Sequence, residues 1–329
     1  MSFDTDAPLR IASDALIGQD AARSLCIALI KDFQTAQVRA GRMAREALIT
    51  DVLARMDPAE QAALAISEDT LAIDSLASMD LIVPINRYFG LATTGIEDHL
   101  FMRKTLGDWA ELVAHHFELM GADAQITFST SGSSGPAKHI THGQAVLRAE
   151  VQAISDSIFR DVAPPRRVLS AVPPHHIYGF LWSVLMPGHL GAQRLQLHDH
   201  APTATVKRGQ AGDVILFTPF LLEKAAAFDL SLKPDVTVVS SGGPMRAETW
   251  ESAKRLGAAR CVEVYGSTET GGIAWRSDPA QPLKLLPHLE RMGDGVKARA
   301  KDTPLPLQDV IAWENDTSFC VIGRGDRVV

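Results

Sequence analysis

The strongest chemical signal in this 329-residue sequence is a decapeptide of hydroxyl side chains and glycines that ends in a single lysine. It occupies positions 129–138 and reads Ser-Thr-Ser-Gly-Ser-Ser-Gly-Pro-Ala-Lys. A strand-like segment, 125–128, precedes it, and apolar residues recur at helical spacing across the following segment, 142–159. A strand, a turn and a helix in that order present backbone N–H groups, hydroxyls and one ammonium group to an anion. We therefore predict a cradle for a polyphosphate here.

The spacing of these residues excludes two other kinds of phosphate-binding loop. In a Walker loop the lysine directly follows the second glycine of G-x4-G, whereas Lys138 lies three residues beyond Gly135. A dinucleotide-binding turn requires G-x-G-x-x-G, which this sequence does not contain. A flexible Ser/Gly linker remains the alternative for the decapeptide taken alone, so the choice depends on motifs elsewhere in the chain.

Short β-branched segments alternate with helical stretches from residue 125 onward. The predicted strands are 167–172, 193–197, 214–217, 236–240 and 261–264. This alternation predicts an α/β fold, with mainly parallel sheets flanked by helices. Helical periodicity in 21–56 and 105–117 predicts a small helical domain ahead of it. We expect a leader at 1–20, a helical domain at 21–120, a hinge at 121–124 and an α/β domain at 121–329.

Three further motifs follow predicted strands directly. They are Pro-Pro-His-His-Ile-Tyr-Gly at 173–179, Ser-Gly-Gly-Pro at 241–244 and Val-Tyr-Gly-Ser-Thr-Glu at 264–269. Ligands of parallel sheets gather at the carboxyl ends of the strands, so we expect these loops and the decapeptide to meet in one crevice. A last motif, Val-Ile-Gly-Arg-Gly-Asp-Arg, lies at 321–327.

The order and content of these loops resemble the adenylate-forming, or AMP-binding, superfamily. Acyl- and aryl-CoA synthetases and the adenylation domains of peptide synthetases belong to it. The resemblance covers residues 128–329 and implies the large N-terminal domain of such a ligase. It also implies the reaction, in which ATP and Mg²⁺ convert a carboxylic acid into an acyl-adenylate for transfer to the thiol of CoA or of phosphopantetheine. Catalysis of this kind is mostly positioning and neutralisation of charge.

The resemblance implies that two loops hold the phosphates and the magnesium ion. Lys138 would neutralise the β- and γ-phosphates, and Thr130 would bind phosphate and the metal. Thr268 would donate to the α-phosphate, and Glu269 would supply a hard carboxylate oxygen to Mg²⁺. The other phosphate-loop residues implied are Ser131, Gly132, Ser133, Ser134 and Gly135.

The resemblance assigns the nucleoside to three other segments. Tyr265 would stack its ring on the adenine, Asp309 would accept hydrogen bonds from the ribose hydroxyls, and Arg324 would donate to ribose or phosphate. The remaining residues implied in nucleotide binding are Ser241, Gly242, Gly243, Gly266 and Ser267. A buried structural tyrosine and a helix-capping Thr-Glu pair are the alternatives at 265–269.

On the acid side, the resemblance places His176 beside the reacting carboxylate and His175 as its outward neighbour. A purely structural histidine is the alternative. No acidic residue lies between Asp161 and Asp199. The resemblance implies that the stretch around 180–186 lines part of the acyl pocket, and this segment is mostly apolar. An apolar pocket without a carboxylate favours a fatty or aromatic acid over an amino acid.

The segment Leu-Ala-Ile-Asp-Ser-Leu at 71–76 resembles the attachment segment of acyl carrier proteins, a resemblance that extends over 43–113. It implies that Ser75 receives phosphopantetheine. The alternative is a helical domain that only resembles a carrier, because Asp74 or Ser75 can simply cap a helix and Pro84 would interrupt that helix.

Composition limits the classes of partner and the cellular compartment that we expect for this chain. The chain has 32 basic and 39 acidic residues, a formal charge of −7 and no basic run longer than two residues, so we expect no nucleic-acid partner. Three well-separated cysteines indicate neither a disulfide framework nor a zinc site. Without a signal peptide or an apolar run of membrane-spanning length, we expect a cytoplasmic protein. His-Asp-His at 198–200 fits a solvated loop better than a metal site.

The end of the sequence bears on activity. Members of the superfamily continue past a hinge, matched here by Asp326, into a small domain with a second catalytic lysine, whereas this sequence ends at Val329. The resemblance therefore implies that adenylation needs such a domain supplied in trans. We expect a small carboxylic acid and ATP as ligands, with an acyl carrier protein as a further candidate partner. The alternative is a non-catalytic module that binds nucleotide or adenylate.

Overall fold

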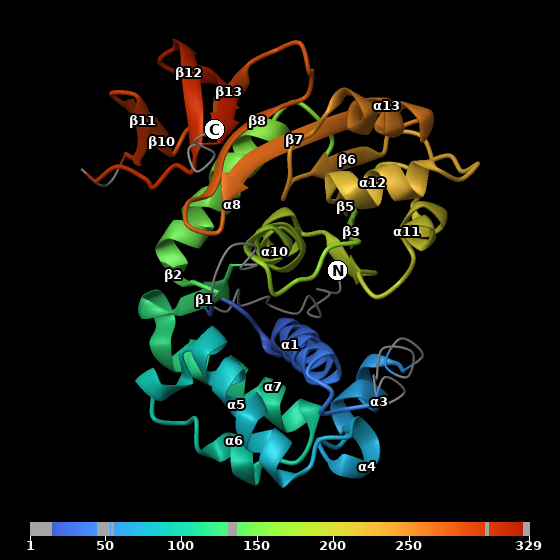
Figure 1. Cartoon of the computed structure of the whole chain (residues 1–329), viewed down its shortest axis with the longest axis vertical. Coiled ribbons are helices and arrows are strands. Elements are labelled where there is room, and N and C mark those ends of the chain that lie inside the picture. The colour runs from blue at the N-terminus through green and yellow to red at the C-terminus, as the bar shows by residue number, and fades with distance from the viewer. Residues whose placement is uncertain (1–14, 45–52, 54–55, 131–136, 300–302, 325–329) are drawn as a thin grey trace, which may run out of the picture.

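The computed structural model describes residues 15–44, 53, 56–130, 137–299 and 303–324. Helices from the first third of the chain gather at one end of the molecule, and the strands and helices of the remaining two thirds form the other end (Figure 1). Both expected kinds of structure are therefore present, in the expected order.

The N-terminal part consists of helices, some of which begin at side-chain caps. α7 begins after Thr105, whose hydroxyl accepts from the N–H of Asp108 while the Asp108 carboxylate accepts from the N–H of Thr105. Asp74 caps α5 in the same region, and that helix continues through Pro84. The second helix predicted within 21–56 lies largely outside the described residues. The helices are α1 (Gln19–Arg39), α3 (Pro58–Ala63), α4 (Glu68–Leu71), α5 (Ser75–Phe89), α6 (His99–Met102) and α7 (Leu106–Met120).

A nine-stranded sheet forms the centre of the rest, in the order β12-β13-β9-β8-β7-β6-β5-β3-β4. The five strands β4, β3, β5, β6 and β7 are parallel, as the alternation of strands and helices predicts. The four strands on the other side are antiparallel extensions. The bounds are β3 (Arg167–Ser170), β4 (Gln193–Gln196), β5 (Val214–Phe217), β6 (Thr237–Ser240), β7 (Arg260–Ser267), β8 (Gly271–Arg276), β9 (Leu283–Leu285), β12 (Asp309–Asn315) and β13 (Ser318–Arg324).

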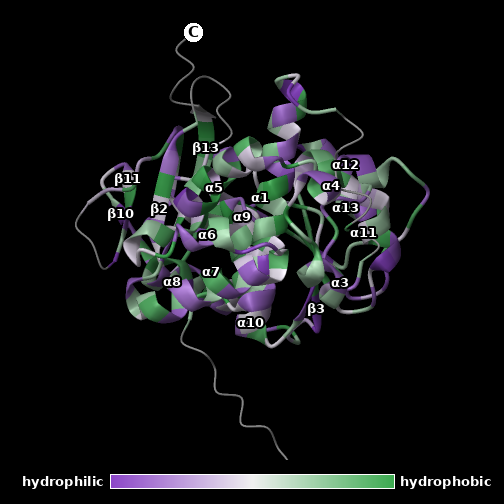
Figure 2. Ribbon diagram, turned by 90° about the horizontal axis from the view of Figure 1, so that it is seen from below, coloured by the Kyte–Doolittle hydropathy of each residue, from purple (hydrophilic) through white to green (hydrophobic). Residues whose placement is uncertain are grey.

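Helices cover both faces of the parallel strands because successive strand residues point to opposite faces. In β5, Leu216 packs into the core shared with α8 (Gln144–Ile158) and the N-terminal helices. Phe217, on the opposite face, packs against the outer helices α11 (Pro202–Arg208), α12 (Pro219–Ala226) and α13 (Ala247–Arg255). In Figure 2 hydrophilic and hydrophobic residues alternate along those outer helices. The remaining helices are α9 (Ile177–Phe180), the π-helical segment η4 (Leu181–Leu185) and α10 (Met186–Leu190).

The decapeptide does not join a strand of this sheet to a helix. β1 (Gln125–Ser129) pairs with β2 (His139–Gly143) in a separate antiparallel hairpin, and α8 starts only after β2. The expected strand–turn–helix order is therefore wrong, because a second strand separates the loop from the helix. Any anion bound there is held by a hairpin loop and not by the N-terminus of α8. A second small hairpin, β10 (Leu289–Met292) with β11 (Gly295–Ala298), lies near the antiparallel edge.

One hydrophobic core runs through both parts of the molecule. It joins buried side chains of α1, α5 and α7 to those of β1, α8 and the parallel strands. Leu16 and Ile17 are buried in it as well, so this end of the predicted leader is packed. The division into three segments stays a prediction. Among the described residues no helix is long and apolar enough to cross a membrane.

Candidate active site

A small pocket lies where β7 meets the segment that leads into β12. Tyr265 donates a hydrogen bond from its hydroxyl to Asp309 Oδ2 at 2.9 Å, and both residues line the pocket together with Gly266 and Ser267. Arg324 faces Asp309 in the β12–β13 ladder, although its side chain lies outside the described set. The structure thus brings together four residues that the sequence assigned to the nucleoside and phosphate.

The turn after β7 carries Thr268 and Glu269, which are both half-buried. Gln308 Nε2 donates to Glu269 Oε1 at 2.7 Å, which joins this turn to the segment before β12. His142 Nε2 lies 2.7 Å from the carbonyl oxygen of Thr268, and since a carbonyl only accepts, that nitrogen carries a proton. The second carboxylate oxygen of Glu269 gives the donor type that Mg²⁺ prefers, so the residue fits the predicted metal role.

Thr130 and Lys138 close the base of the phosphate loop. The N–H of Thr130 donates to the Lys138 carbonyl at 2.9 Å, and the N–H of Lys138 donates to Thr130 Oγ1 at 3.0 Å. The Lys138 side chain is exposed. The loop residues between them, 131–136, and Asp326 lie outside the described residues. Within the described chain, neither Lys138 nor His176 lines the Tyr265–Asp309 pocket.

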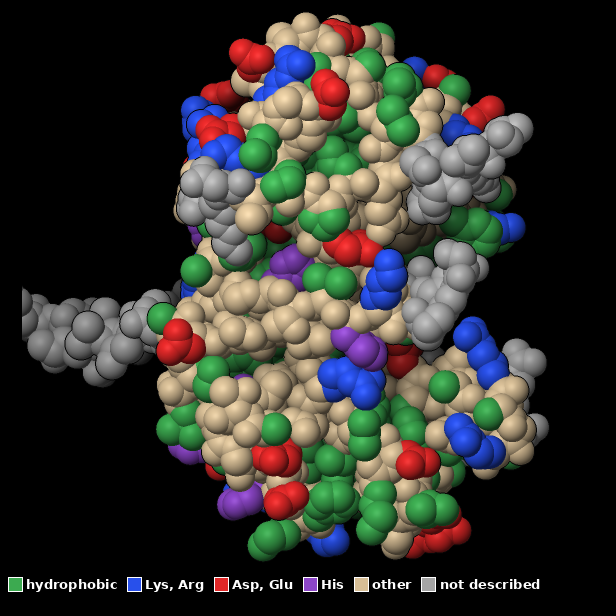
Figure 3. Space-filling model, turned by 60° about the vertical axis from the view of Figure 1, so that its left-hand side comes forward, with side chains coloured by type: hydrophobic (Ala, Val, Ile, Leu, Met, Phe, Trp, Pro, Cys, Tyr) green, Lys and Arg blue, Asp and Glu red, His purple; other side chains and the backbone are tan. Residues whose placement is uncertain are grey.

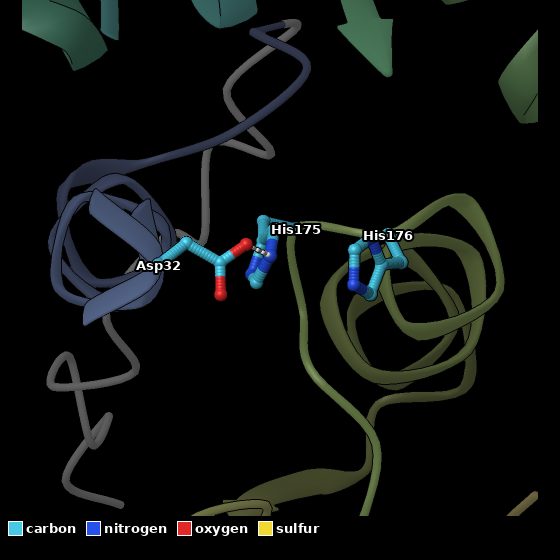
Figure 4. Close-up of side chains that lie close together, drawn as sticks. All are labelled: Asp32, His175 and His176. Atoms are coloured by element: carbon cyan, nitrogen blue, oxygen red, sulfur yellow. Dashed lines mark hydrogen bonds and ion pairs between the residues drawn. The ribbon is translucent and has the colours of Figure 1, made fainter. Parts of the chain in front are cut away.

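The two histidines after β3 differ in burial, opposite to the expectation. His175 is buried and His176 is exposed, so His175 is the inner member of the pair. His175 Nε2 lies 2.7 Å from Oδ2 of Asp32, which comes from α1, and the two imidazole rings are 4.3 Å apart between centroids (Figure 4). Sequence reasoning missed Asp32, because nothing local to α1 marks a carboxylate that meets a loop 143 residues away.

Two histidines of this region, His176 and His198, have lowered pKa values. His176 reaches the surface, but the protein packed around its ring desolvates it and, together with His175, lowers its pKa. Burial lowers the pKa of His198 to about 4. Partial burial alone would raise the pKa of Asp32, but the hydrogen bond from His175 and the nearby histidines lower it. Asp32 is therefore an anion that holds His175 through the contact with its Nε2.

Asp32, His175 and His176 have ligand atoms within 4.8 Å of one another, as in a metal site. His175 Nε2 is already bonded to Asp32, and its Nδ1 is buried with no hydrogen-bond partner among the described residues. We interpret the cluster as a hydrogen-bonded pair beside His176.

Tyr178 connects the histidine loop to the ends of two other strands. Its hydroxyl lies 2.9 Å from the carbonyl of Val239 in β6 and 3.2 Å from that of Phe217 in β5. Ser241, which is buried, and the exposed Gly242 and Gly243 follow β6 directly. Gly242 has φ +81°, which favours glycine, and its backbone is open to a ligand. The loops after β3 and β6 therefore lie at one edge of the sheet, as predicted.

The apolar segment 180–186 does not identify the acid. Phe180, Leu181, Trp182 and Met186 are buried in the main hydrophobic core, and only Val184 and Leu185 are partly exposed. Their apolar character is explained by packing against α8 and the sheet. The inference from this segment to a fatty or aromatic substrate therefore loses its support.

Charged side chains of both signs are interspersed on the face shown in Figure 3.

Ser75 is exposed at the start of α5, where Asp74 accepts from the N–H of Ala77 at 2.7 Å. The capping role that the sequence allowed for Asp74 is therefore present. The phosphopantetheine role of Ser75 stays a prediction.

Comparison with known proteins defines the class. Residues 95–308 match the family described as AMP-binding enzyme. The fold is similar to an AMP-forming acyl-CoA synthetase/AMP-acid ligase II-like protein from Dyadobacter fermentans, with 20% identity and a TM-score of 0.51 over 67% of this chain and 66% of that one. Apo MatB from Rhodopseudomonas palustris gives 18% identity and a TM-score of 0.54 over 75% and 58%. The fold is therefore that of AMP-forming ligases.

Two proteins named 4-coumarate–CoA ligase are similar in sequence. The protein from Cereibacter sphaeroides is 40% identical over 96% of this chain and 76% of its own length. The protein from Rhodobacter capsulatus is 37% identical over 80% of this chain and 69% of its own length. The chain belongs to the family of AMP-binding enzymes. It is of the acid–thiol ligase type, which activates a carboxylic acid with ATP as an acyl-adenylate.

Proposed function

We propose that this chain activates an aromatic carboxylic acid and that the acceptor thiol is that of coenzyme A. The observation that carries the nucleotide half of the proposal is the hydrogen bond between Tyr265 and Asp309, which joins two distant segments around one pocket. The two relatives named 4-coumarate–CoA ligase support an aromatic acid and coenzyme A. A fatty acid is the alternative substrate class.

Each candidate residue has a chemical task in this proposal. The ring of Tyr265 faces the adenine, and Asp309, held by the Tyr265 hydroxyl, accepts from the ribose hydroxyls. Thr268 donates to the α-phosphate, and Lys138 neutralises the outer phosphates. Glu269, held by Gln308, ligates Mg²⁺, which would neutralise the charge of the leaving pyrophosphate.

The acid side of the site depends on His176. A neutral imidazole can orient the substrate carboxylate by donating a hydrogen bond without holding it as a tight ion pair. The low pKa of His176 fits that role, because it keeps the ring uncharged at pH 7. Asp32 fixes the neighbouring His175 and with it the loop.

The proposal is tested by acid-dependent exchange of pyrophosphate into ATP, with hydroxycinnamic, benzoic and fatty acids as substrates. We expect exchange with the aromatic acids and loss of exchange in Lys138→Met and Glu269→Gln. Assays with and without an added C-terminal domain show whether this chain needs one for turnover. Binding of ATP without exchange under every condition would support the non-catalytic module instead.

Coenzyme A is tested separately from the acid. The purified chain is incubated with ATP, Mg²⁺ and the best acid, and thioester formation is compared for coenzyme A and for a holo acyl carrier protein. Thioester with the carrier alone would contradict the proposed acceptor while leaving the adenylation step intact.

A further inference from the structure

A buried carboxyl group on α8 contacts the strand that follows the Thr268–Glu269 turn. Glu150 is 2% exposed, and its Oε1 accepts a hydrogen bond from the N–H of Gly272 at 2.5 Å. A carboxyl group is rarely buried to this extent unless it has a specific partner. The contact spans 122 residues of sequence, so it fixes α8 against the start of β8.

Two glycines make this close approach possible. A Cβ atom on Gly271 would lie 2.1 Å from Oε2 of Glu150, and one on Gly272 would lie 2.8 Å from Oε1. Real Cβ atoms do not approach that closely, so the carboxyl group occupies space that any other residue would fill. Gly271 also has φ +70°, which favours glycine. The buried carboxyl group of Glu150 therefore requires glycine at both positions.

β2, which directly precedes α8, contacts the other end of the Thr268–Glu269 turn. His142, in β2, donates to the Thr268 carbonyl, and Glu150 accepts from Gly272 four residues later. β2 and α8 follow the phosphate loop without interruption. The segment after Lys138 thus contacts the turn on both sides of Glu269. This places Lys138, at the base of the phosphate loop, and the turn on one continuous piece of chain.

We propose that Glu150 is a positioning residue for nucleotide binding, which holds the turn bearing Thr268 and Glu269 in register with the loop that ends at Lys138. The inference rests on the proposed function, since it takes those residues as phosphate and magnesium contacts. Glu150 itself does not touch the nucleotide. Its carboxyl oxygen acts only as an acceptor for Gly272, so an uncharged amide oxygen of the same length can replace it.

The experiment compares three variants of the full chain by their dissociation constant for a fluorescent ATP analogue with Mg²⁺ and by their urea unfolding. We expect Glu150→Ala to weaken binding about tenfold, the effect of one lost buried hydrogen bond. Glu150→Gln restores binding to within about twofold, because its amide oxygen still accepts. The control is Ile154→Ala, one turn further along α8, which destabilises the core but leaves the Glu150–Gly272 hydrogen bond in place.

Three outcomes would overturn the inference. They are wild-type binding in Glu150→Ala, equal weakening in Glu150→Gln, and equal weakening in Ile154→Ala, which would reduce the effect to general stability. If Glu150→Ala does not fold, Glu150→Asp replaces it, because the shorter side chain withdraws from Gly272. Absence of ATP binding in the wild-type chain would instead overturn the proposed function, and this inference with it.

Discussion

The hydroxyl of Tyr265 donates a hydrogen bond to the carboxylate of Asp309 at 2.9 Å, across 44 residues of sequence. The contact fixes an aromatic ring and a carboxylate on one wall of the same pocket. A flat ring and a carboxylate in that relation suit a base and its ribose. The contributions of the ring and of the hydrogen bond can be tested separately, because a mutation can remove the hydroxyl and keep the ring.

Tyr265→Phe keeps the ring and removes the hydrogen bond. We expect the Michaelis constant for ATP to rise severalfold, with stability lower by about 1 kcal/mol. Tyr265→Ala removes the stacking surface as well and should be clearly worse. Steady-state exchange kinetics at varied ATP concentration measure both. Equal ATP dependence in Tyr265→Ala and the wild type would contradict the adenine assignment.

Glu269→Gln tests the metal ligand. The amide keeps the size of the side chain, and the Gln308 contact involves one of the two oxygens. We expect exchange to fall by about 10²-fold or more, the usual loss when an electrostatic stabiliser is removed. The matched control is Gln308→Ala, which removes the contact and should show a smaller loss because the Glu269 carboxylate remains. A variant with normal magnesium dependence would show that Glu269 does not bind the ion.

The stability of the protein should fall as pH drops from about 6.5 to about 4. His198 has a lowered pKa, so over this window the unfolded chain binds a proton that the folded chain does not. Burial is the main cause; Asp199 and Asp32 oppose it, and Lys31 and His175 add to it. Thermal unfolding from pH 4 to 8 should show a flatter profile for His198→Gln. An unchanged slope would mean that other groups govern acid unfolding.

Glu150 should lower the stability of the protein as pH rises, which is the opposite of the effect of His198. Burial raises its pKa to about 8, although the hydrogen bond from Gly272 opposes the shift. Its stabilising effect is complete below about 4.5 and is lost as pH rises to about 8, because the folded chain then holds a proton that the unfolded chain releases. The limiting slope is about 1.4 kcal/mol per pH unit. We expect Glu150→Gln to gain stability over the wild type as pH rises from 5 to 8.

Ser75 can be tested without any activity assay. The serine is exposed, and Leu76, Met79 and Val83 form an exposed apolar stripe on the same helix. If the carrier resemblance reflects function, incubation with coenzyme A and a phosphopantetheinyl transferase should increase the intact mass. Ser75→Ala is the control and should not change. An unmodified wild-type chain would leave Asp74 as a helix cap and nothing more.

Local signals predicted most of the fold. Each strand of the parallel sheet was predicted to within three residues at either end. Buried β5 and β6 read as short apolar runs rich in β-branched residues, as expected of parallel strands. The hairpin β1–β2 was missed, since the second strand, His-Ile-Thr-His-Gly, has weak apolar alternation and follows a glycine-rich loop. Pairing between strands is a long-range property that the local pattern does not encode.

The candidate site was predictable only in part. The resemblance to the adenylate-forming superfamily indicated Tyr265 and Asp309, and the structure brings them into contact. Asp32, His142 and Glu150 carry no motif, because their roles depend on meeting a distant segment. Glycines at 271 and 272 were the available signal for Glu150, as adjacent glycines at the start of a strand indicate close approach of another group.

The continuous hydrophobic core has a consequence for any attempt to divide this polypeptide. Cutting near residue 121 would strip α1, α5 and α7 from the strands and from α8, and each fragment would expose side chains that now face the other. We expect neither fragment to be recovered alone in a folded state. Co-expression of both halves would be needed to rebuild the nucleotide pocket from pieces.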